Sequence, residues 1–304
     1  MRKNITINNK KYIFDDQIRD NLAVRTGFDR LAQQTFDISF EEWHKGGWWQ
    51  ENYQPHLLLC DGKVAANLSV NRIDCQIDGV RRRLLQLGTV MTAPEERGQG
   101  LCRFLMEEVL WRYLDSCDGI YLYANDSVLD FYPKFGFEQR EEYQHSLHLA
   151  GGRGQAVRLS MEDPKQAELF LSAVRTAVPM EQASLLHPES LLMFYCTGPM
   201  QEQVYWLPEQ QTALVMEQEG EILQIHQMFC PKVMSTEEIA ALAAAPSVRQ
   251  VQFGFTPLDC AKLECSVHKE EDTTFFWHRS HPFWLREADA QGETRRMFPT
   301  LSHA

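Results

Sequence analysis

The feature that most constrains the fold is a change of hydrophobic period at Gly98 and Gly100. Before the glycines, apolar and β-branched runs are separated by Asp61-Gly62 and Asp78-Gly79, dipeptides that favour tight hairpin turns. After them, apolar residues recur four positions apart, which is typical of an amphipathic helix: Leu101, Leu105, Val109 and Tyr113. The sequence therefore predicts three hairpin-connected strands at 56–60, 64–77 and 81–92, followed by a helix that begins after Gly100.

The rest of the chain predicts a tandem arrangement. Residues 119–125 indicate a buried strand, 126–135 a short helix ended by Gly136, and 137–149 an alternating strand, with helical material at 15–50. Glycines interrupt the pattern at 149–157, after which the same order of strands and helix returns, ending in a late strand at 273–279. We predict an α+β (α/β) fold of two similar domains, 1–150 and 151–304, each a mostly antiparallel mixed sheet with flanking helices.

The helix after Gly100 starts without a capping side chain, because no Ser, Thr, Asp or Asn stands at the junction. Its first N–H groups and the positive end of its dipole therefore need another partner. Glycines let backbone approach an anion closely, so a phosphate or pyrophosphate would suit this position. A plain glycine turn whose amides face water remains the alternative.

Charge and cysteine usage exclude several classes of function. The net charge of −12, with Arg81–Arg83 as the one basic run, argues against a nucleic-acid partner and favours a cationic small molecule. No apolar stretch has the length of a secretory signal or a membrane span, so we expect a cytoplasmic protein without membrane contact. The eight cysteines show no recognised metal spacing, and we expect reduced thiols and no metal.

Two motifs together resemble the GNAT superfamily of acetyl-CoA-dependent N-acetyltransferases. The phosphate-binding loop of that superfamily, Q/R-x-x-G-x-G/A, reads here as "EERGQG" from Glu95 to Gly100. Its second signature is an Asn followed by an aromatic-Tyr-x-Lys-x-Gly-Phe run, which reads as Asn125 and then "FYPKFGF" at 131–137. The tandem layout resembles the branch that includes the enhanced-intracellular-survival-type acetyltransferases, although the chain lacks the length for their third domain.

The resemblance implies an N-acetyltransferase that uses acetyl-CoA as co-substrate, acts on a small or peptide-borne primary amine and proceeds by direct attack in a ternary complex. Glu95 replaces the Gln or Arg of the loop, so we expect the backbone amides and Arg97 to hold the pyrophosphate. The implied cofactor-binding residues are Val90, Met91, Thr92, Arg97, Gly98, Gln99, Gly100, Leu101, Cys102 and Asn125. Tyr132 is the implied general acid toward the CoA sulfur. Packing alone for Tyr132 and a helix N-cap for Asn125 are the alternatives.

The acceptor side is less defined by the sequence. In this superfamily the helical region around 40–56 shapes the acceptor pocket, and here it carries Trp43, Trp48, Trp49 and Tyr53, whose ring faces would suit an ammonium group. Packing of these rings in the core is the alternative. No general base is identified: acidic side chains, a water chain and the carboxylate of Ala304 all remain open. A non-catalytic acyl-CoA-binding module is the competing function.

The second domain is expected to be degenerate. At the place equivalent to the glycine loop the chain reads "STEE", in which Ser235 and Glu238 form a capping box that would occupy the helix end. No second aromatic-Tyr-x-Lys-x-Gly-Phe run follows. We therefore expect this half to brace the first domain, to wall the acceptor pocket and to keep Phe275, Phe276 and Trp277 in the core.

Overall fold

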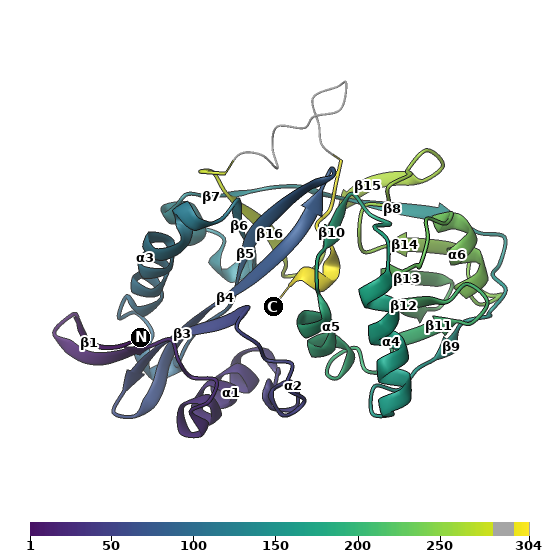
Figure 1. Ribbon diagram of the computed structural model, residues 1–304. Coiled ribbons are helices and arrows are strands. Elements are labelled where there is room, and N and C mark those ends of the chain that lie inside the picture. The colour runs from purple at the N-terminus through teal and green to yellow at the C-terminus, as the bar shows by residue number, and fades with distance from the viewer. Residues whose placement is uncertain (282–294, 304) are drawn as a thin grey trace.

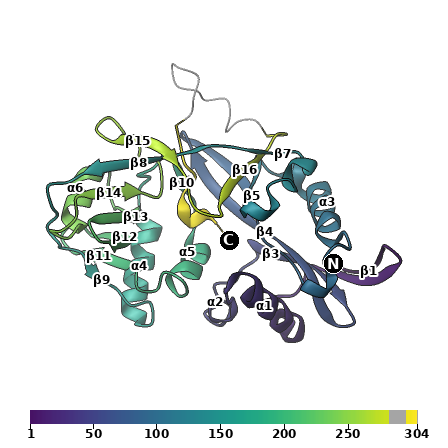
Figure 2. The same cartoon turned by 180° about the vertical axis from the view of Figure 1, so that it is seen from behind.

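The computed structural model describes residues 1–281 and 295–303, which form two β-sheets lying side by side with helices against each (Figure 1, Figure 2). The first sheet has the spatial order β1 (Arg2–Ile7), β2 (Lys10–Asp15), β3 (Tyr53–Cys60), β4 (Lys63–Ile77), β5 (Val80–Thr92), β6 (Gly119–Ala124), β16 (Thr274–His278) and β7 (Phe137–Gln139), with β10 (Ala183–Leu185) also paired to β4. The second has the order β15 (Glu264–His268), β8 (Glu142–His148), β14 (Gln250–Phe253), β13 (Ile222–Phe229), β12 (Thr212–Glu219), β11 (Val204–Leu207) and β9 (Val157–Arg158). The predicted α+β class with two mixed sheets is confirmed.

The helices pack on both faces of the two sheets. They are α1 (Leu22–Phe36), α2 (Glu41–Lys45), α3 (Leu101–Tyr113), α4 (Pro164–Thr176), α5 (Glu189–Cys196) and α6 (Thr236–Ala243). Short 3₁₀ turns are η1 (Pro94–Glu96), η2 (Leu114–Ser116), η3 (Asp126–Val128), η4 (Tyr132–Phe135) and η6 (Thr300–Ser302). None of the helices in the described part of the chain is long and apolar enough to cross a membrane.

The hairpins form where the sequence predicts them. Asp61-Gly62 joins β3 to β4 and Asp78-Gly79 joins β4 to β5, and all four residues have positive φ. One hairpin was not predicted: β1 and β2 pair across Asn8-Asn9, whose φ angles are 48° and 62°. Asn tolerates this left-handed conformation, so the Asn8-Asn9 pair is the sequence signal that could have predicted this hairpin.

Each half contains the same parallel unit. Strands β5 and β6 are parallel and connected through α3, and strands β13 and β14 are parallel and connected through α6. Leu105, Met106 and Val109 of α3 are fully buried against the first sheet, as the helical period predicts. Ile239 and Ala240 of α6 are fully buried against the second sheet.

The two halves exchange a strand. The segment predicted as one strand at 137–149 divides into β7, at the edge of the first sheet, and β8, inside the second sheet between β14 and β15. Reciprocally, β15 lies at the edge of the second sheet, and β16 crosses to lie between β6 and β7 in the first. The sheets therefore do not follow a division at residue 150, because each sheet is completed by a strand from the other half.

The exchanged strand β16 carries the aromatic run predicted to be core. Phe275, Phe276 and Trp277 are 3%, 2% and 0% exposed, so this part of the prediction is confirmed. The predicted short helix at 126–135 is instead two 3₁₀ turns, η3 and η4, that end at Gly136 with φ +90°. Pro133 within this segment explains the interruption, because proline removes a backbone donor.

Candidate active site

The glycine loop leaves a helix end open. Gly98 and Gly100 have φ angles of +76° and +80°, and α3 begins after Gly100 without any side-chain cap. Among the described residues, the amide groups of residues 98–103 have no hydrogen-bond acceptor, and the first amide of this region with a partner is that of Phe104, which donates to the Gly100 carbonyl at 3.0 Å. A Cβ atom on Gly98 would meet nothing within 4 Å. These features fit an anion held by backbone amides.

The hairpin of β1 and β2 supports this loop. The Asn8 side-chain amide donates to the Gln99 carbonyl at 2.9 Å. Glu96 accepts from Lys10 Nζ at 2.6 Å and from the Tyr12 hydroxyl at 3.0 Å, and the Lys10 contact lowers the pKa of its carboxyl group. The Glu96 charge is thus neutralised by Lys10. Glu95 is exposed to solvent.

Strand β5 bulges at Thr89 and Val90, which together face one residue of β4. Thr89 has a φ of +49°. Its carbonyl oxygen accepts from Asn67 Nδ2 at 2.8 Å, and its hydroxyl lies 2.7 Å from the Tyr53 hydroxyl. Beyond the pair Leu87 and Leu122, β5 and β6 are no longer hydrogen-bonded to each other.

A pocket of about 370 Å³ lies where β5 and β6 separate. Its walls come from both halves of the chain: Phe36, Ile38, Phe40, Gln86, Leu87, Gly88, Thr89, Val90, Tyr123, Ala124, Asn125, Tyr132, Phe194, Tyr195, Pro199, Asp272, Thr273 and His303. The second half therefore supplies part of the wall of this pocket.

Tyr132 lines this pocket from η4. Its side chain is 5% exposed, and burial raises the pKa of its hydroxyl above the ordinary value. The hydroxyl has no hydrogen-bond partner among the described residues, although the ring packs against Phe137 and Phe276. A protonated phenol without an internal acceptor is free to donate to a molecule in the pocket.

Asn125 lines the pocket at the end of β6. Its side-chain amide donates to the Asp272 carboxylate at 2.8 Å, and Asp272 also accepts from the Asp126 amide at 2.6 Å. Although Asn125 stands at the N-cap position of η3, its side chain makes no cap hydrogen bond, so the alternative role as a helix cap is wrong. Asp272 belongs to the crossing segment before β16, which the sequence did not associate with this site.

Comparison with known proteins agrees with this geometry. Residues 24–140 match the family model described as an acetyltransferase (GNAT) domain. Residues 24–140 are therefore similar to a GNAT acetyltransferase domain. This family uses acyl-CoA as its co-substrate, which fits the open helix end after Gly100.

The fold extends the similarity over most of the chain. A probable N-acyltransferase of Enterococcus faecalis is 14% identical with a TM-score of 0.58, covering 91% of this chain and 75% of that one. A GCN5-related N-acetyltransferase of Kribbella flavida is 19% identical with a TM-score of 0.54, covering 88% and 70%. Eis1 of Mycobacterium abscessus is 13% identical with a TM-score of 0.50, covering 87% and 72%. No curated protein matches the chain in sequence.

None of the four aromatic residues predicted to line the acceptor pocket lines the pocket that contains Tyr132. Trp43, Trp49 and Tyr53 are each 4% exposed and belong to the core under α1 and α2. Trp48 is half-buried and packs against both this core and the core under α4 and α5 of the second half. Packing, the alternative that the sequence left open, is correct for this cluster, because Trp43 stacks on Trp49 and meets Phe194 edge to face. Trp49 and Tyr53 also border a separate groove with Arg72.

The other residues implied as cofactor ligands lie around the loop. Val90 lines the pocket of the GNAT domain, whereas Met91 is 2% exposed and points into the core under α1. The Thr92 hydroxyl lies 3.0 Å from Cys102 Sγ, beside the open helix end. Arg97 is exposed and contacts the Thr92 carbonyl at 3.4 Å.

The chain terminus reaches the pocket, which the sequence did not predict. The Tyr195 hydroxyl donates to the His303 carbonyl, and the His303 ring lies 3.5 Å from that of Tyr123. Burial lowers the pKa of His303 to about 4, so its ring is neutral at pH 7. Ala304, whose carboxylate is one of the bases left open, lies outside the described residues.

The second half closes its equivalent helix end. Ser235 is the N-cap of α6 and accepts from the Glu238 amide at 3.3 Å, as predicted. This contact leaves one fewer free amide for an anion at that position.

Proposed function

We propose that the chain is an acetyl-CoA-dependent N-acetyltransferase that transfers the acetyl group to a primary amine by direct attack in a ternary complex, with Tyr132 as general acid. The observation that supports this most strongly is the unpartnered, protonated Tyr132 hydroxyl in the pocket where β5 and β6 separate. The GNAT match over residues 24–140 supplies the reaction class.

The backbone amides of residues 98–102 would bind the pyrophosphate of acetyl-CoA, whereas the Arg97 amide, which was also expected to do so, donates to the Pro94 carbonyl at 3.4 Å. Gly98 and Gly100 allow this because they place no Cβ between the backbone and the anion. Asn8 and Lys10 contribute indirectly, since they hold Gln99 and Glu96 in place. Asn125 would contact the pantetheine arm, with its amide oriented by Asp272.

The bulge in β5 would orient the thioester. An amide donor at Val90 that points toward the carbonyl oxygen stabilises the negative charge that develops there. Thr89 lies at the centre of this bulge and is tied to Tyr53 and Asn67, so the donor is positioned before substrate arrives.

The transfer forms a C–N bond and breaks the C–S bond. Tyr132 would give its proton to the departing thiolate, and the raised pKa of its hydroxyl keeps that proton available at neutral pH. The amine must be neutral to attack, and the proton that its nitrogen loses as the C–N bond forms passes to water. His303 is a weak base at pH 7 because its pKa is about 4.

The deciding experiment is an assay of the purified chain with acetyl-CoA and a panel of primary amines, following CoA release and the acetylated product. Product formation supports the enzyme. Binding of acetyl-CoA without transfer or hydrolysis would instead indicate a non-catalytic acyl-CoA-binding module.

A further inference from the structure

One face of the second sheet is only partly covered by helices. Helices α4 and α5 cover this face over Ala213, Val215 and Phe229, and α6 covers the opposite face. Beyond α4 and α5, one row of paired residues crosses four strands: Glu217, Gln224, Gln252 and Ser146. A sheet face inside a folded chain is normally apolar, so a continuous polar row indicates that this face meets water or a polar ligand.

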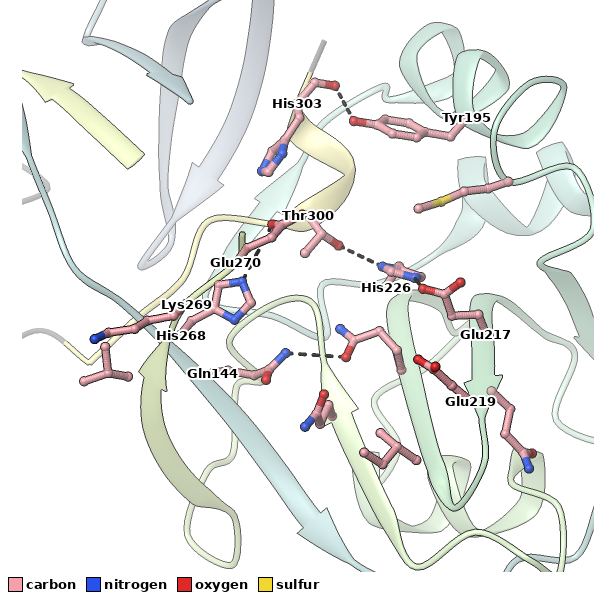
Figure 3. A pocket seen from close by; sticks show the side chains of 16 residues that line it. Gln144, Tyr195, Glu217, Glu219, His226, His268, Lys269, Glu270, Thr300 and His303 are labelled. Atoms are coloured by element: carbon pink, nitrogen blue, oxygen red, sulfur yellow. Dashed lines mark hydrogen bonds and ion pairs between the residues drawn. The ribbon is translucent and has the colours of Figure 1, made fainter. Parts of the chain in front are cut away.

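This polar face forms the floor of a pocket of about 880 Å³ (Figure 3). Strand β15 and the crossing segment that follows it supply His268, Lys269 and Glu270 on one side. Strands β12 and β13 supply Glu217, Glu219 and His226 on the other. The pocket is therefore formed by the strand exchange as well as by the second sheet.

The charge in this pocket is mainly negative. Three carboxylates line it, those of Glu217, Glu219 and Glu270, and Lys269 is the one Lys or Arg residue among the lining residues. His268 lies 3.9 Å from Glu270 and offsets part of its charge when protonated. The Glu219 carboxylate makes no hydrogen bond or ion pair with the described residues. The Glu217 carboxylate is held by Gln203 at 2.7 Å and His226 at 3.1 Å rather than by a Lys or Arg, so these two carboxylates are the ones best placed to bind a cation.

The other ionisable groups do not cancel this charge. His226 Nε2 lies 3.1 Å from Glu217 Oε1, and its Nδ1 lies 3.3 Å from the Thr300 hydroxyl. Burial lowers the pKa of His226, so the ring is neutral at pH 7 and holds the Glu217 carboxylate in place. An anionic ligand would be repelled here, whereas an ammonium group would find two carboxylates and several amide oxygens.

The pocket borders the proposed transfer site. Tyr195 and His303 line both this pocket and the pocket that contains Tyr132. The Tyr195 hydroxyl donates to the His303 carbonyl, so this contact forms the border between the two (Figure 3). A ligand lying on the polar face therefore ends next to the residues that would carry out transfer.

We propose that the polar face of the second sheet binds the second ammonium group of a diamine or polyamine acceptor, whose other amine enters the pocket at Tyr132. This inference rests on the proposed function. It gives the second half a role in selecting the acceptor, because the carboxylates that recognise the distant charge belong to β12.

The test compares matched amines and matched variants. We would measure kcat/KM for putrescine and cadaverine against butylamine and pentylamine, with glucosamine as a hydroxylated amine that carries a single ammonium group. The variant is Glu217→Gln/Glu219→Gln, which keeps the shape and hydrogen-bonding capacity of both side chains. Glu209→Gln is the control, because Glu209 is an exposed carboxylate of the same half outside the pocket.

We expect the parent to prefer each diamine over its monoamine by about tenfold, as for the loss of one charge-assisted contact. The double variant should lose this preference while its kcat/KM for monoamines is unchanged, and Glu209→Gln should behave as the parent. Three results would overturn the inference without contradicting acetylation itself. They are an equal kcat/KM for diamines and monoamines, a diamine preference that the double variant retains, and a preference for glucosamine over the diamines.

A direct binding measurement separates this inference from the proposed function. Calorimetric titration with spermidine in the presence of CoA requires no turnover. If no amine is acetylated but spermidine binds the parent and the control at least fivefold more tightly than the double variant, the cation site stands and the proposed function fails. No spermidine binding, or equal binding to all three proteins, overturns the site.

Discussion

The hydroxyl group of Tyr53 lies 2.7 Å from the hydroxyl of Thr89, the residue with positive φ at which β5 bulges. Tyr53 is buried in the core under α1 and α2, so the contact connects that core to the backbone beside the pocket that Tyr132 lines. Tyr53, which the sequence placed in the acceptor pocket, therefore lies in the core and holds Thr89, the neighbour of Val90.

Replacing Tyr53 with Phe should lower kcat by about threefold to tenfold and the free energy of unfolding by about 1 kcal/mol, the usual contribution of one hydrogen bond. Steady-state kinetics at saturating acetyl-CoA and urea unfolding measure the two effects. Tyr205→Phe is the control, because the Tyr205 hydroxyl makes no hydrogen bond within the described residues. A loss of stability with unchanged kcat would show that the contact is structural only.

Gly98→Asp should abolish acetyl-CoA binding, because it adds a side chain and a negative charge at the open end of α3. Gly62→Asp is the matched control: Gly62 has φ +78°, close to the +76° of Gly98, and lies in the turn between β3 and β4. Calorimetry of the parent should saturate at one equivalent of acetyl-CoA. A second equivalent that survives the Gly98 change would reveal a working site in the other half.

Tyr132→Phe should lower kcat by roughly 10²-fold with little change in acetyl-CoA affinity, since only the proton donor is lost. Burial raises the pKa of this hydroxyl, so it stays protonated as pH rises past its ordinary pKa of 10.0. The parent should therefore show no loss of kcat from Tyr132 ionisation below that pH. Unchanged turnover in the Phe variant would assign Tyr132 to packing alone.

Residues 1–150 expressed alone should fail to unfold cooperatively and to bind acetyl-CoA. This fragment lacks β16, so β6 and β7 lose their shared neighbour and the ring of Tyr132 loses Phe276. Circular dichroism during thermal unfolding and calorimetry would check this, with the full chain as control. A fragment that unfolds cooperatively and binds acetyl-CoA would contradict the importance of the exchanged strand.

Glu181 should make stability depend on pH. Its carboxyl accepts from Gln227 Nε2 at 2.7 Å and is 6% exposed, and burial raises its pKa from 4.5 to about 8. The folded state binds the proton of the Glu181 carboxyl more tightly than the unfolded state does. Its contribution to the free energy of unfolding is therefore fully present below pH 4.5 and is lost as pH rises through 8.

Glu181→Gln keeps a neutral side chain of the same shape, so its stability relative to the parent should increase with pH by about 1 kcal/mol or more. Melting temperatures of both proteins on either side of the pKa give the difference. Glu209→Gln, at an exposed position, should show no such trend. A pH-independent difference for the Glu181 variant would mean that this carboxyl group is not protonated in the folded state.

Local patterns were sufficient for the elements nearest the loop. The Asp-Gly dipeptides determined both hairpins, because few residues adopt positive φ without strain. The uncapped glycines before Leu101 determined the open helix end, and Ser235 determined the closed one. These outcomes depend on residues within one or two turns of each other, which is why the sequence alone predicts them.

Tertiary structure decided which sheet each exchanged strand joins and which residues line the pocket, because both depend on which distant surfaces bury each other. No local pattern in β8 or β16 assigns either strand to a sheet, and only the packing of the whole chain places each of them in the sheet of the other half. The same packing turns Trp43 and Trp49 into core and brings Tyr195, Asp272 and His303 to the pocket of Tyr132. The sequence by itself predicted the open end of α3 and singled out Tyr132, whereas the walls of the pocket that Tyr132 lines exist only after the two halves have exchanged their strands.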